Sequence, residues 1–288
     1  MSAKTPSPMI ATPGFPAQPR GQHCYDEPCL RCRGPNVSSS TTHNRGGEVT
    51  RVGKMRIVVW NCRMGFVKKR AVLYALKPDI AVIPECSQDA IKLCSDEGYT
   101  GCWWGDKKNK GLAVIASKPW TLEVGRPPTQ KWIAPVKLIG ATNFLLLAVW
   151  ACPVGQVKEL NYIGQVFEAI KRHNGWFSDG LPTVICGDFN SNAIFDHGRK
   201  KRNHTAVVTM LEQRSLLSAY HTFFSEEQGE ETRPTHYFWY RKSRPFHIDY
   251  VFLPSKWIPS AKVTVGTYRK WRPLSDHVPL IVDFSPQA

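Results

Sequence analysis

The sequence has no long hydrophobic run, and it holds far fewer acidic than basic residues. No apolar stretch approaches the roughly 20 residues of a membrane-spanning helix, and the N-terminus lacks the apolar core of a secretory signal. We therefore expect a cytoplasmic protein. Lysine and arginine number 38 against 23 aspartates and glutamates, a net charge of +15. This balance suggests a polyanionic partner, such as nucleic acid, an acidic membrane surface or a phosphorylated metabolite.

Cysteine is present, but its number and positions do not indicate a disulfide framework. The count is nine, which is odd, and three cysteines of the later chain, Cys62, Cys86 and Cys186, lie inside or beside apolar runs. Such positions are typical of reduced, buried thiols. We therefore expect free cysteines in the folded part of the chain.

Residues 1–54 lack tryptophan and show no helical or strand periodicity. They are rich in proline, glycine, serine and threonine, a composition that buries too little apolar surface to offset the entropy of ordering. We predict a disordered basic tail here and one domain over residues 55–288, which hold all ten tryptophans. If the GGEV stretch is encoded by a purine-rich, ribosome-binding-like sequence, Val52 or Met55 would be the true start, which is a hypothesis.

One motif in the tail has metal-ligating residues. HCYDEPCLRC offers three thiols and one imidazole, a set that could bind zinc tetrahedrally. The spacing is irregular and no second CxxC half follows, so a cysteine-bearing disordered tail is the favoured alternative. The residues of this zinc hypothesis are His23, Cys24, Cys29 and Cys32.

From Met55 onward the pattern changes to many short strands and a few helices. Apolar spacing predicts four helices, at residues 67–77, 88–97 (with Ser87 as its N-cap), 158–173 and 204–214. Buried-type strands are expected at MRIVVW, DIAVIPEC, 100–104, GLAVIAS, TLEV, WIAPVKLIG, FLLLAVW, TVICGDFN, HYFWY, HIDYVFL, KVTVG and PLIVDF. Strands that partly alternate with helices and partly follow one another predict a mixed α/β fold, a four-layer sandwich of two packed mixed sheets flanked by helices.

Polar residues stand at one end of five of these strands. Because strand ends can converge in space while far apart in sequence, such residues are candidates for one site. Each of these residues could instead have a purely structural role, as a single turn residue, as part of a two-residue turn or at the solvated start of a helix. Asp249 is the hardest to explain structurally, because a carboxylate inside an apolar strand needs a partner. The candidates are Asn61, Glu85, Asp188 with Asn190, Asp249, and Asp276 with His277.

The ordered set VVWNC, IPEC, GDFNSN, HIDYVFL and SDHVPL resembles the endonuclease/exonuclease/phosphatase superfamily, over residues 55–286. That resemblance implies a hydrolase that cleaves phosphoester bonds with a divalent metal, Mg²⁺ with Mn²⁺ as a substitute. It implies that Glu85 is the principal metal ligand, with Asn61 and Asp276 in the coordination sphere or one water away. Magnesium prefers such oxygen ligands and keeps several of its waters.

The remaining candidates match the chemistry of an attacking water. Asp188 is expected to act as general base, and Asn190 to donate to the phosphoryl oxygen or the water. His277 would donate to a non-bridging oxygen as negative charge builds, oriented by Asp249. Asn61 is counted with both the catalytic and the metal-binding groups.

Two positions depart from the family pattern. Arg63 stands where many relatives have an asparagine or aspartate. This difference removes a possible metal ligand and weakens the interpretation that the site binds two metal ions. Trp150 stands near the point where relatives often have a histidine or tyrosine on the phosphate. Three histidines have no assigned role and are more often structural: His173, His221 and His236.

Basic clusters interleaved with aromatic residues lie close to the site motifs, a combination that suits nucleic-acid backbone tracking and base stacking. Substrate contacts are expected from Arg63, Trp150, Arg241, Lys242 and Trp271. The favoured hypothesis is a magnesium-dependent nuclease. The alternatives are a hydrolase of a small-molecule or lipid phosphoester, and a catalytically silent nucleic-acid-binding domain.

Overall fold

The first strand, β1 (Met55–Val59), pairs with two strands from opposite ends of the domain. In the computed structural model, which describes residues 53–125, 132–198 and 201–287, β1 runs parallel to β2 (Ile80–Cys86) and antiparallel to β14 (Leu280–Phe284). The sheet has six strands in the order β13-β14-β1-β2-β4-β3. Its other members are antiparallel to their neighbours: β13 (Lys262–Val265), β4 (Lys110–Ser117) and β3 (Tyr99–Lys107).

The second sheet also has six strands, in the order β5-β6-β7-β8-β12-β9. Its centre is the parallel pair β7 (Phe144–Trp150) and β8 (Thr183–Asp188), and the other pairings are antiparallel. The remaining strands are β5 (Thr121–Val124), β6 (Ile133–Ile139), β12 (Asp249–Pro254) and β9 (Leu216–Ser218).

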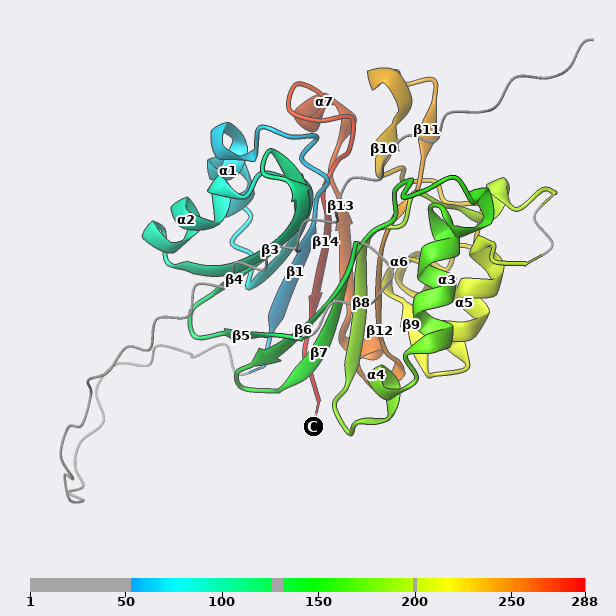
Figure 1. The fold of residues 1–288 in the computed structure, drawn as a ribbon, viewed down its shortest axis with the longest axis horizontal. Helices are drawn as coiled ribbons and strands as arrows, with labels where there is room; N and C mark the ends of the chain where they lie inside the picture. The colour runs from blue at the N-terminus through cyan, green and yellow to red at the C-terminus, as the bar shows by residue number, and fades with distance from the viewer. Residues whose placement is uncertain (1–52, 126–131, 199–200, 288) are drawn as a thin grey trace, which may run out of the picture. The chain divides into compact units, whose positions relative to one another are not determined.

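The two sheets pack face to face, and helices cover their outer faces (Figure 1). Helices α1 (Phe66–Tyr74) and α2 (Asp89–Asp96) lie on the first sheet, and α3 (Ile163–Arg172) and α5 (His204–Glu212) lie on the second. Each sheet is therefore buried on both faces, which requires strands that are apolar throughout. In β1, for example, Ile57 and Val59 face the other sheet, whereas Val58 packs against the helix layer. The predicted mixed α/β sandwich of four layers is confirmed.

Short elements complete the fold, and three of them gather near one end of the sandwich (Figure 1). The antiparallel pair β10 (His236–Tyr237) and β11 (Pro245–Phe246) stands there beside α7 (Tyr268–Trp271). Helices α4 (Gly175–Ser178) and α6 (Ala219–Phe224) connect strands of the second sheet. Single turns of 3₁₀ helix lie at Lys158–Leu160, Ala193–Phe195 and Phe238–Tyr240, and a longer one at Ser255–Ser260.

Three local predictions were wrong. The helix expected over 158–173 is broken at Tyr162, whose φ of 53° is outside the helical region, so a 3₁₀ turn precedes α3. The N-cap of α2 is Gln88 and not Ser87, and no side chain caps this helix end. HYFWY is a strand only at His236–Tyr237, because Trp239 and Tyr240 adopt positive φ angles that end the strand.

Cysteine behaves as expected in the part of the chain that the structure describes: six cysteines are present and all are free. The zinc hypothesis at His23, Cys24, Cys29 and Cys32 lies outside the described residues. Within residues 53–125, 132–198 and 201–287, every helix is too short or too polar to cross a bilayer.

Candidate functional site

Strand topology brings the polar strand ends of both sheets to one end of the sandwich, which is called the site edge here. β1, β2 and β8 end at the site edge, and β12 and β14, which run antiparallel to β8 and β1, begin there. The register pairs Asp249 directly with Asp188. Ser275 Oγ donates to the carbonyl of Asn61 (2.8 Å), and the indole of Trp60 donates to the carbonyl of His277 (3.1 Å). These bonds tie the end of β1 to the segment that precedes β14.

Asp188 is fully buried and is surrounded by amide donors. Its Oδ2 accepts from Asn61 Nδ2 (2.9 Å) and from Asn190 Nδ2 (3.0 Å), and its Oδ1 accepts from the backbone N–H of Asn190 (2.9 Å). Burial raises the pKa of the Asp188 carboxyl above its ordinary value, and the nearby charge of Asp249 raises it further. A raised pKa improves a carboxylate as a proton acceptor near neutral pH.

Gly187 allows the Asp188 strand to lie close to β7. Its φ is 144°, and a Cβ at this position would overlap the carbonyl oxygen of Val149, its register partner in β7. Only glycine fits such an approach without moving the strand. The glycine of the GDFN motif therefore has a packing role that supports the neighbouring carboxylate.

Glu85 leaves its strand through a β-bulge. The pairing of β2 with β4 shifts register between Pro84 and Cys86, and Glu85 has a φ of 60°. Bulges of this kind redirect a side chain. The Glu85 carboxylate is partly exposed, 3.3 Å from Lys110 Nζ and 3.5 Å from Asn61 Nδ2.

Asp276 lies between two basic side chains. Its Oδ2 is 2.9 Å from the guanidinium of Arg63 and 3.8 Å from Nε2 of His236. Burial alone would raise the pKa of the Asp276 carboxyl, but the imidazoles of His236 and His277 and the Arg63 charge hold it below its ordinary value. Arg63 is itself positioned, since its guanidinium lies 4.4 Å from the ring centre of Tyr240. Asp276 is therefore held as a carboxylate.

His277 and Asp249 form a buried pair. Nδ1 of His277 donates to Oδ2 of Asp249 at 2.9 Å. Burial by itself would lower the pKa of His277, but the Asp249 carboxylate outweighs it and raises that pKa above the ordinary value. Thr235 supports the pair, because its hydroxyl accepts from the backbone N–H groups of Ile248 and Asp249 (3.0 and 3.1 Å). The arrangement keeps the imidazole oriented and charged, with Nε2 as its second donor.

The oxygen donors at this edge fit a hard divalent cation. Glu85 and Asp276 offer carboxylates that are partly exposed, and each is paired with a side-chain cation that a metal ion could displace. Asn61 is directed differently: its Oδ1 accepts the backbone N–H of Arg63 (2.9 Å), while its amide nitrogen faces Asp188 and Glu85. Among the described residues, ligand atoms of His236, Asp276 and His277 also lie within 4.8 Å of one another. Glu85 and Asp276 would hold the metal, and the Asn61 amide would lie between Glu85 and Asp188.

The predicted substrate contacts divide into exposed and buried residues. Arg63, Arg241 and Lys242 are exposed at this end of the molecule. Trp271, however, is only 2% exposed and packs against Trp60 with ring centres 5.0 Å apart, so it is a core residue. Trp150 is 5% exposed, beside Trp132 and Lys110. Both rings are therefore covered by their neighbours, and the contacts of Trp271 and Trp150 with substrate stay predictions.

Several residues near the site carried little signal in the sequence. Thr235 and Ser275 act through hydrogen bonds of their hydroxyl groups that no spacing predicts. Lys110 is the first residue of β4, and it pairs with Glu85 at the bulge in β2. His236 lies against His277, with ring centres 4.4 Å apart, and its Nδ1 is buried without a hydrogen-bond partner among the described residues. His173 and His221, the other unassigned histidines, stack on Trp176 and pair with Glu231, respectively.

Comparison with known proteins agrees with this geometry. Residues 58–277 match the model of the endonuclease/exonuclease/phosphatase family. No match was found among curated protein sequences.

Solved structures share the fold at low sequence identity. An AP endonuclease from Archaeoglobus fulgidus matches with a TM-score of 0.62 and 16% identity, over 80% of this chain and 99% of that one. Truncated TDP2 from Caenorhabditis elegans matches with a TM-score of 0.59 and 14% identity, over 81% and 98%. The 3′-5′ exonuclease NExo from Neisseria meningitidis matches with a TM-score of 0.55 and 18% identity, over 81% and 100%. At these identities the likeness shows the fold alone.

Proposed function

Because the chain belongs to the endonuclease/exonuclease/phosphatase family, whose members are hydrolases that cleave phosphoester bonds, we propose that it is a magnesium-dependent nuclease. The family match confirms the resemblance found in the motifs and makes the protein a hydrolase. One observation carries the finer proposal: a buried, amide-bonded carboxylate at Asp188 lies in register with the Asp249–His277 pair. A base and a charged donor are thereby held at the same sheet edge.

In the proposed reaction, Asp188 accepts a proton from the water that attacks phosphorus. Asn61 and Asn190 keep its carboxylate oriented, and the raised pKa of Asp188 favours the proton transfer. His277 donates from Nε2 to a non-bridging oxygen as charge develops, while Asp249 fixes the ring through Nδ1. When bound at Glu85 and Asp276, a divalent ion would supply Lewis-acid polarisation of the phosphoryl group and stabilise the leaving oxygen.

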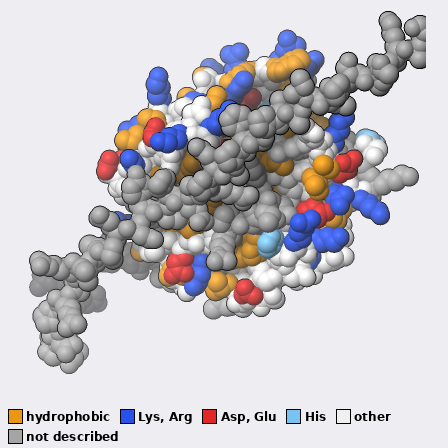
Figure 2. All heavy atoms as spheres, in the orientation of Figure 1, with side chains coloured by type: hydrophobic (Ala, Val, Ile, Leu, Met, Phe, Trp, Pro, Cys, Tyr) orange, Lys and Arg blue, Asp and Glu red, His pale blue; other side chains and the backbone are white. Residues whose placement is uncertain are grey.

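The charged and aromatic surface around this edge supports nucleic acid as substrate. Trp239 is 60% exposed on the turn between β10 and β11, and Arg241 and Arg244 lie over its ring at 5.7 and 4.7 Å. Figure 2 shows lysine and arginine side chains along the upper edge, where Figure 1 places α7, β10 and β11. Such groups can neutralise phosphates and stack on bases. One structural relative, NExo, is described bound to a product DNA hairpin, which agrees with this substrate class.

The proposal is tested by incubating the protein with plasmid DNA, single-stranded DNA and RNA, in Mg²⁺ and in EDTA. We expect cleavage of at least one substrate in Mg²⁺ and none in EDTA. Glu85→Gln should abolish most of this activity, whereas Glu123→Gln, which removes an exposed carboxylate paired with Lys137, is the matched control and should not. Full activity of Glu85→Gln at saturating Mg²⁺ would contradict the metal assignment.

The same assay separates the two alternatives. Inertness towards every nucleic acid, with release of phosphate or phosphocholine from small substrates, would favour a hydrolase of small or lipid phosphoesters. Binding of nucleic acid without cleavage in any divalent metal would favour a silent binding domain.

A further inference from the structure

A small pocket opens directly beside Asn190. Its volume is about 160 Å³, and it is lined by Tyr162, Asn190, Ser191, Phe195 and Asp196. Asn190 is also a hydrogen-bond partner of Asp188, so the pocket shares one wall with the proposed catalytic group. Whatever binds here is therefore adjacent to the reacting phosphate.

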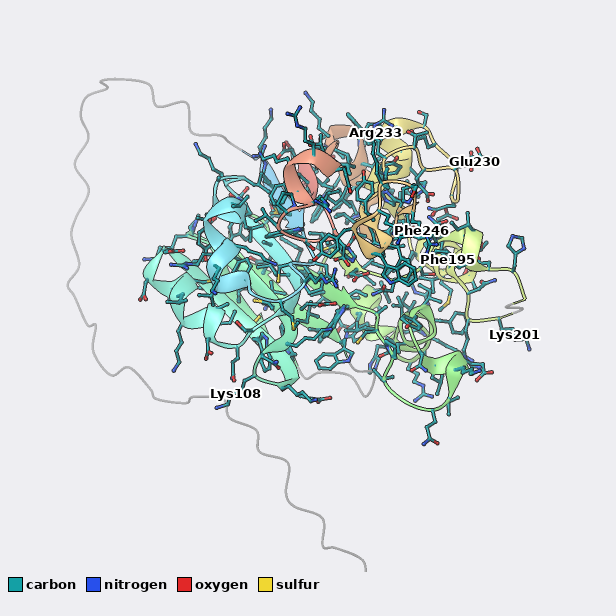
Figure 3. The ribbon with its side chains drawn as sticks, turned by 90° about the horizontal axis from the view of Figure 1, so that it is seen from above. Lys108, Phe195, Lys201, Glu230, Arg233 and Phe246 are labelled. Carbon is teal, nitrogen blue, oxygen red and sulfur yellow. The ribbon has the colours of Figure 1, made fainter. Side chains whose placement is uncertain are left out.

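A row of rings connects this pocket with the catalytic imidazole. Phe195 lies 5.3 Å from Phe246, Phe246 lies 6.2 Å from His236, and His236 lies 4.4 Å from His277, all between ring centres. Figure 3, seen from the end of the sandwich that carries the site, shows Phe195 and Phe246 side by side. The ring row therefore links the pocket to the buried imidazole of His277.

The polar groups of the pocket suit an uncharged, planar ligand. Both oxygens of Asp196 are engaged at the start of α5, where they accept from the backbone N–H groups of His204 and Thr205 (2.8 and 2.9 Å). None of the five lining residues is a lysine or arginine, so the lining offers no cation to a phosphate. The other lining residues are Asn190 with its amide, Ser191 and Tyr162 with their hydroxyls, and Phe195 with its ring. Groups of these kinds can form hydrogen bonds with the edge of a planar ligand and contact its face.

The pocket is also held rigid, although it is open to solvent. Phe195 is 41% exposed, although its ring also contacts the ring of Phe246. Its 3₁₀ turn is fixed by Asn192, whose Oδ1 accepts from Ile194 N and whose Nδ2 donates to the carbonyl of His247 (3.0 and 2.9 Å). Tyr162 on the opposite side has φ 53° and ψ −127°, a conformation that non-glycine residues rarely adopt. An exposed ring kept in place in this way is suited to stacking.

Building on the proposed nuclease function, we propose that this pocket binds a nucleobase next to the scissile phosphate, stacked against Phe195. A base can reach a concave pocket only after it leaves the helical stack. The substrate is therefore a nucleic acid with unpaired bases at the cleavage point, either a single strand or a frayed end. A sugar–phosphate chain without bases should bind and react less well.

The test compares oligothymidylate with an abasic sugar–phosphate chain of the same length. Cleavage is measured in Mg²⁺ as kcat/KM, and binding is measured in EDTA by fluorescence anisotropy. For the wild-type protein we expect the chain with bases to be preferred about tenfold or more in both measurements, as for base stacking on an aromatic ring. Phe195→Ala should reduce this preference severalfold, and Phe195→Trp, which keeps a ring, should retain it. Phe223→Ala is the matched control, because Phe223 is similarly exposed (43%) on α6.

The outcomes distinguish a failure of the base-binding proposal from a failure of the nuclease proposal. If the wild-type protein cleaves both chains equally and binds them equally, the pocket is not a base site, while the nuclease function stands. If neither chain is cleaved but the binding preference depends on Phe195, the base site is supported and the nuclease proposal fails. A preference that is the same in Phe195→Ala as in the wild-type protein would overturn the assignment of this pocket.

Discussion

Nδ1 of His277 lies 2.9 Å from Oδ2 of Asp249, and both side chains are almost fully buried. The pair joins two segments that are 28 residues apart. Among the described residues, Oδ1 of Asp249 is buried and has no hydrogen-bond partner. The imidazole and the carboxylate therefore depend on each other, so they should act as one unit.

We expect the effects of removing these two groups not to add. His277→Ala should lower kcat by roughly 10²-fold or more, as for loss of one transition-state donor. Asp249→Asn should cost less, because the imidazole stays in place with a poorer orientation. The double variant should resemble His277→Ala in single-turnover kinetics. Effects that multiply would mean that the residues work at separate places.

Arg63 should weaken metal binding through its contact with Asp276. The guanidinium lies 2.9 Å from Oδ2 of Asp276 and is partly exposed, so a metal ion at this carboxylate must displace it. We expect Arg63→Gln to lower the Mg²⁺ concentration at half-maximal activity by about two- to fivefold, since exposed ion pairs are worth up to about 1 kcal/mol. Calorimetry with Mn²⁺ should show the same change without substrate. Arg70→Gln, which breaks the surface pair with Glu97, is the control. An unchanged Mg²⁺ concentration at half-maximal activity in Arg63→Gln would show that Arg63 does not compete with the metal ion for Asp276.

Gly187 should tolerate no side chain. A Cβ here would overlap the backbone of Val149 at a φ of 144°, which must push β8 away from β7. We expect Gly187→Ala to reduce the free energy of unfolding by about 2–4 kcal/mol, in the range of a strained core position. Unfolding in denaturant measures this change in the free energy of unfolding. Gly155→Ala, where an added Cβ meets no atom within 4 Å, should change stability little. Equal stability of both variants would show that β8 can shift freely.

Glu231 should make the fold sensitive to acid. Burial alone would raise its pKa, but hydrogen bonds from His221, Asn192 and the backbone of Gly229 lower it to about 2. A carboxyl with a depressed folded pKa stabilises the fold above its unfolded pKa, and this stability is lost as pH falls from about 5 to about 2. The loss should be on the order of 2–3 kcal/mol for this group.

Thermal unfolding between pH 6 and pH 2.5 measures this dependence. Glu231→Gln should be less stable at pH 6 and should show a shallower decline on acidification. Glu230→Gln changes the exposed neighbouring residue and should keep the wild-type slope. A Glu231→Gln profile parallel to that of the wild type would show that this carboxyl is not the titrating group.

The sequence by itself determined the architecture and most of the site candidates. Strands buried on both faces must be apolar throughout, so runs such as IVVW could be recognised, and a polar residue at the end of such a run stands out against it. In this way Asp188, Asp249 and the Asp276-His277 pair were found before any contact was known. The motif order then identified the family, because several modest motifs in a fixed order are far more specific than any one of them.

The tertiary structure alone decided which side chains touch and which are exposed. Trp271 and Trp239 look alike in sequence, both beside basic residues, yet one is packed on Trp60 and the other stands in solvent. The pairing of Arg63 with Asp276 spans 213 residues, and the ring row from His277 to Phe195 passes through three separate segments. Such contacts depend on strand register, on the bulge at Glu85 and on local positive φ angles. Hydrophobic periodicity records burial along one element, and it carries no information about which elements meet.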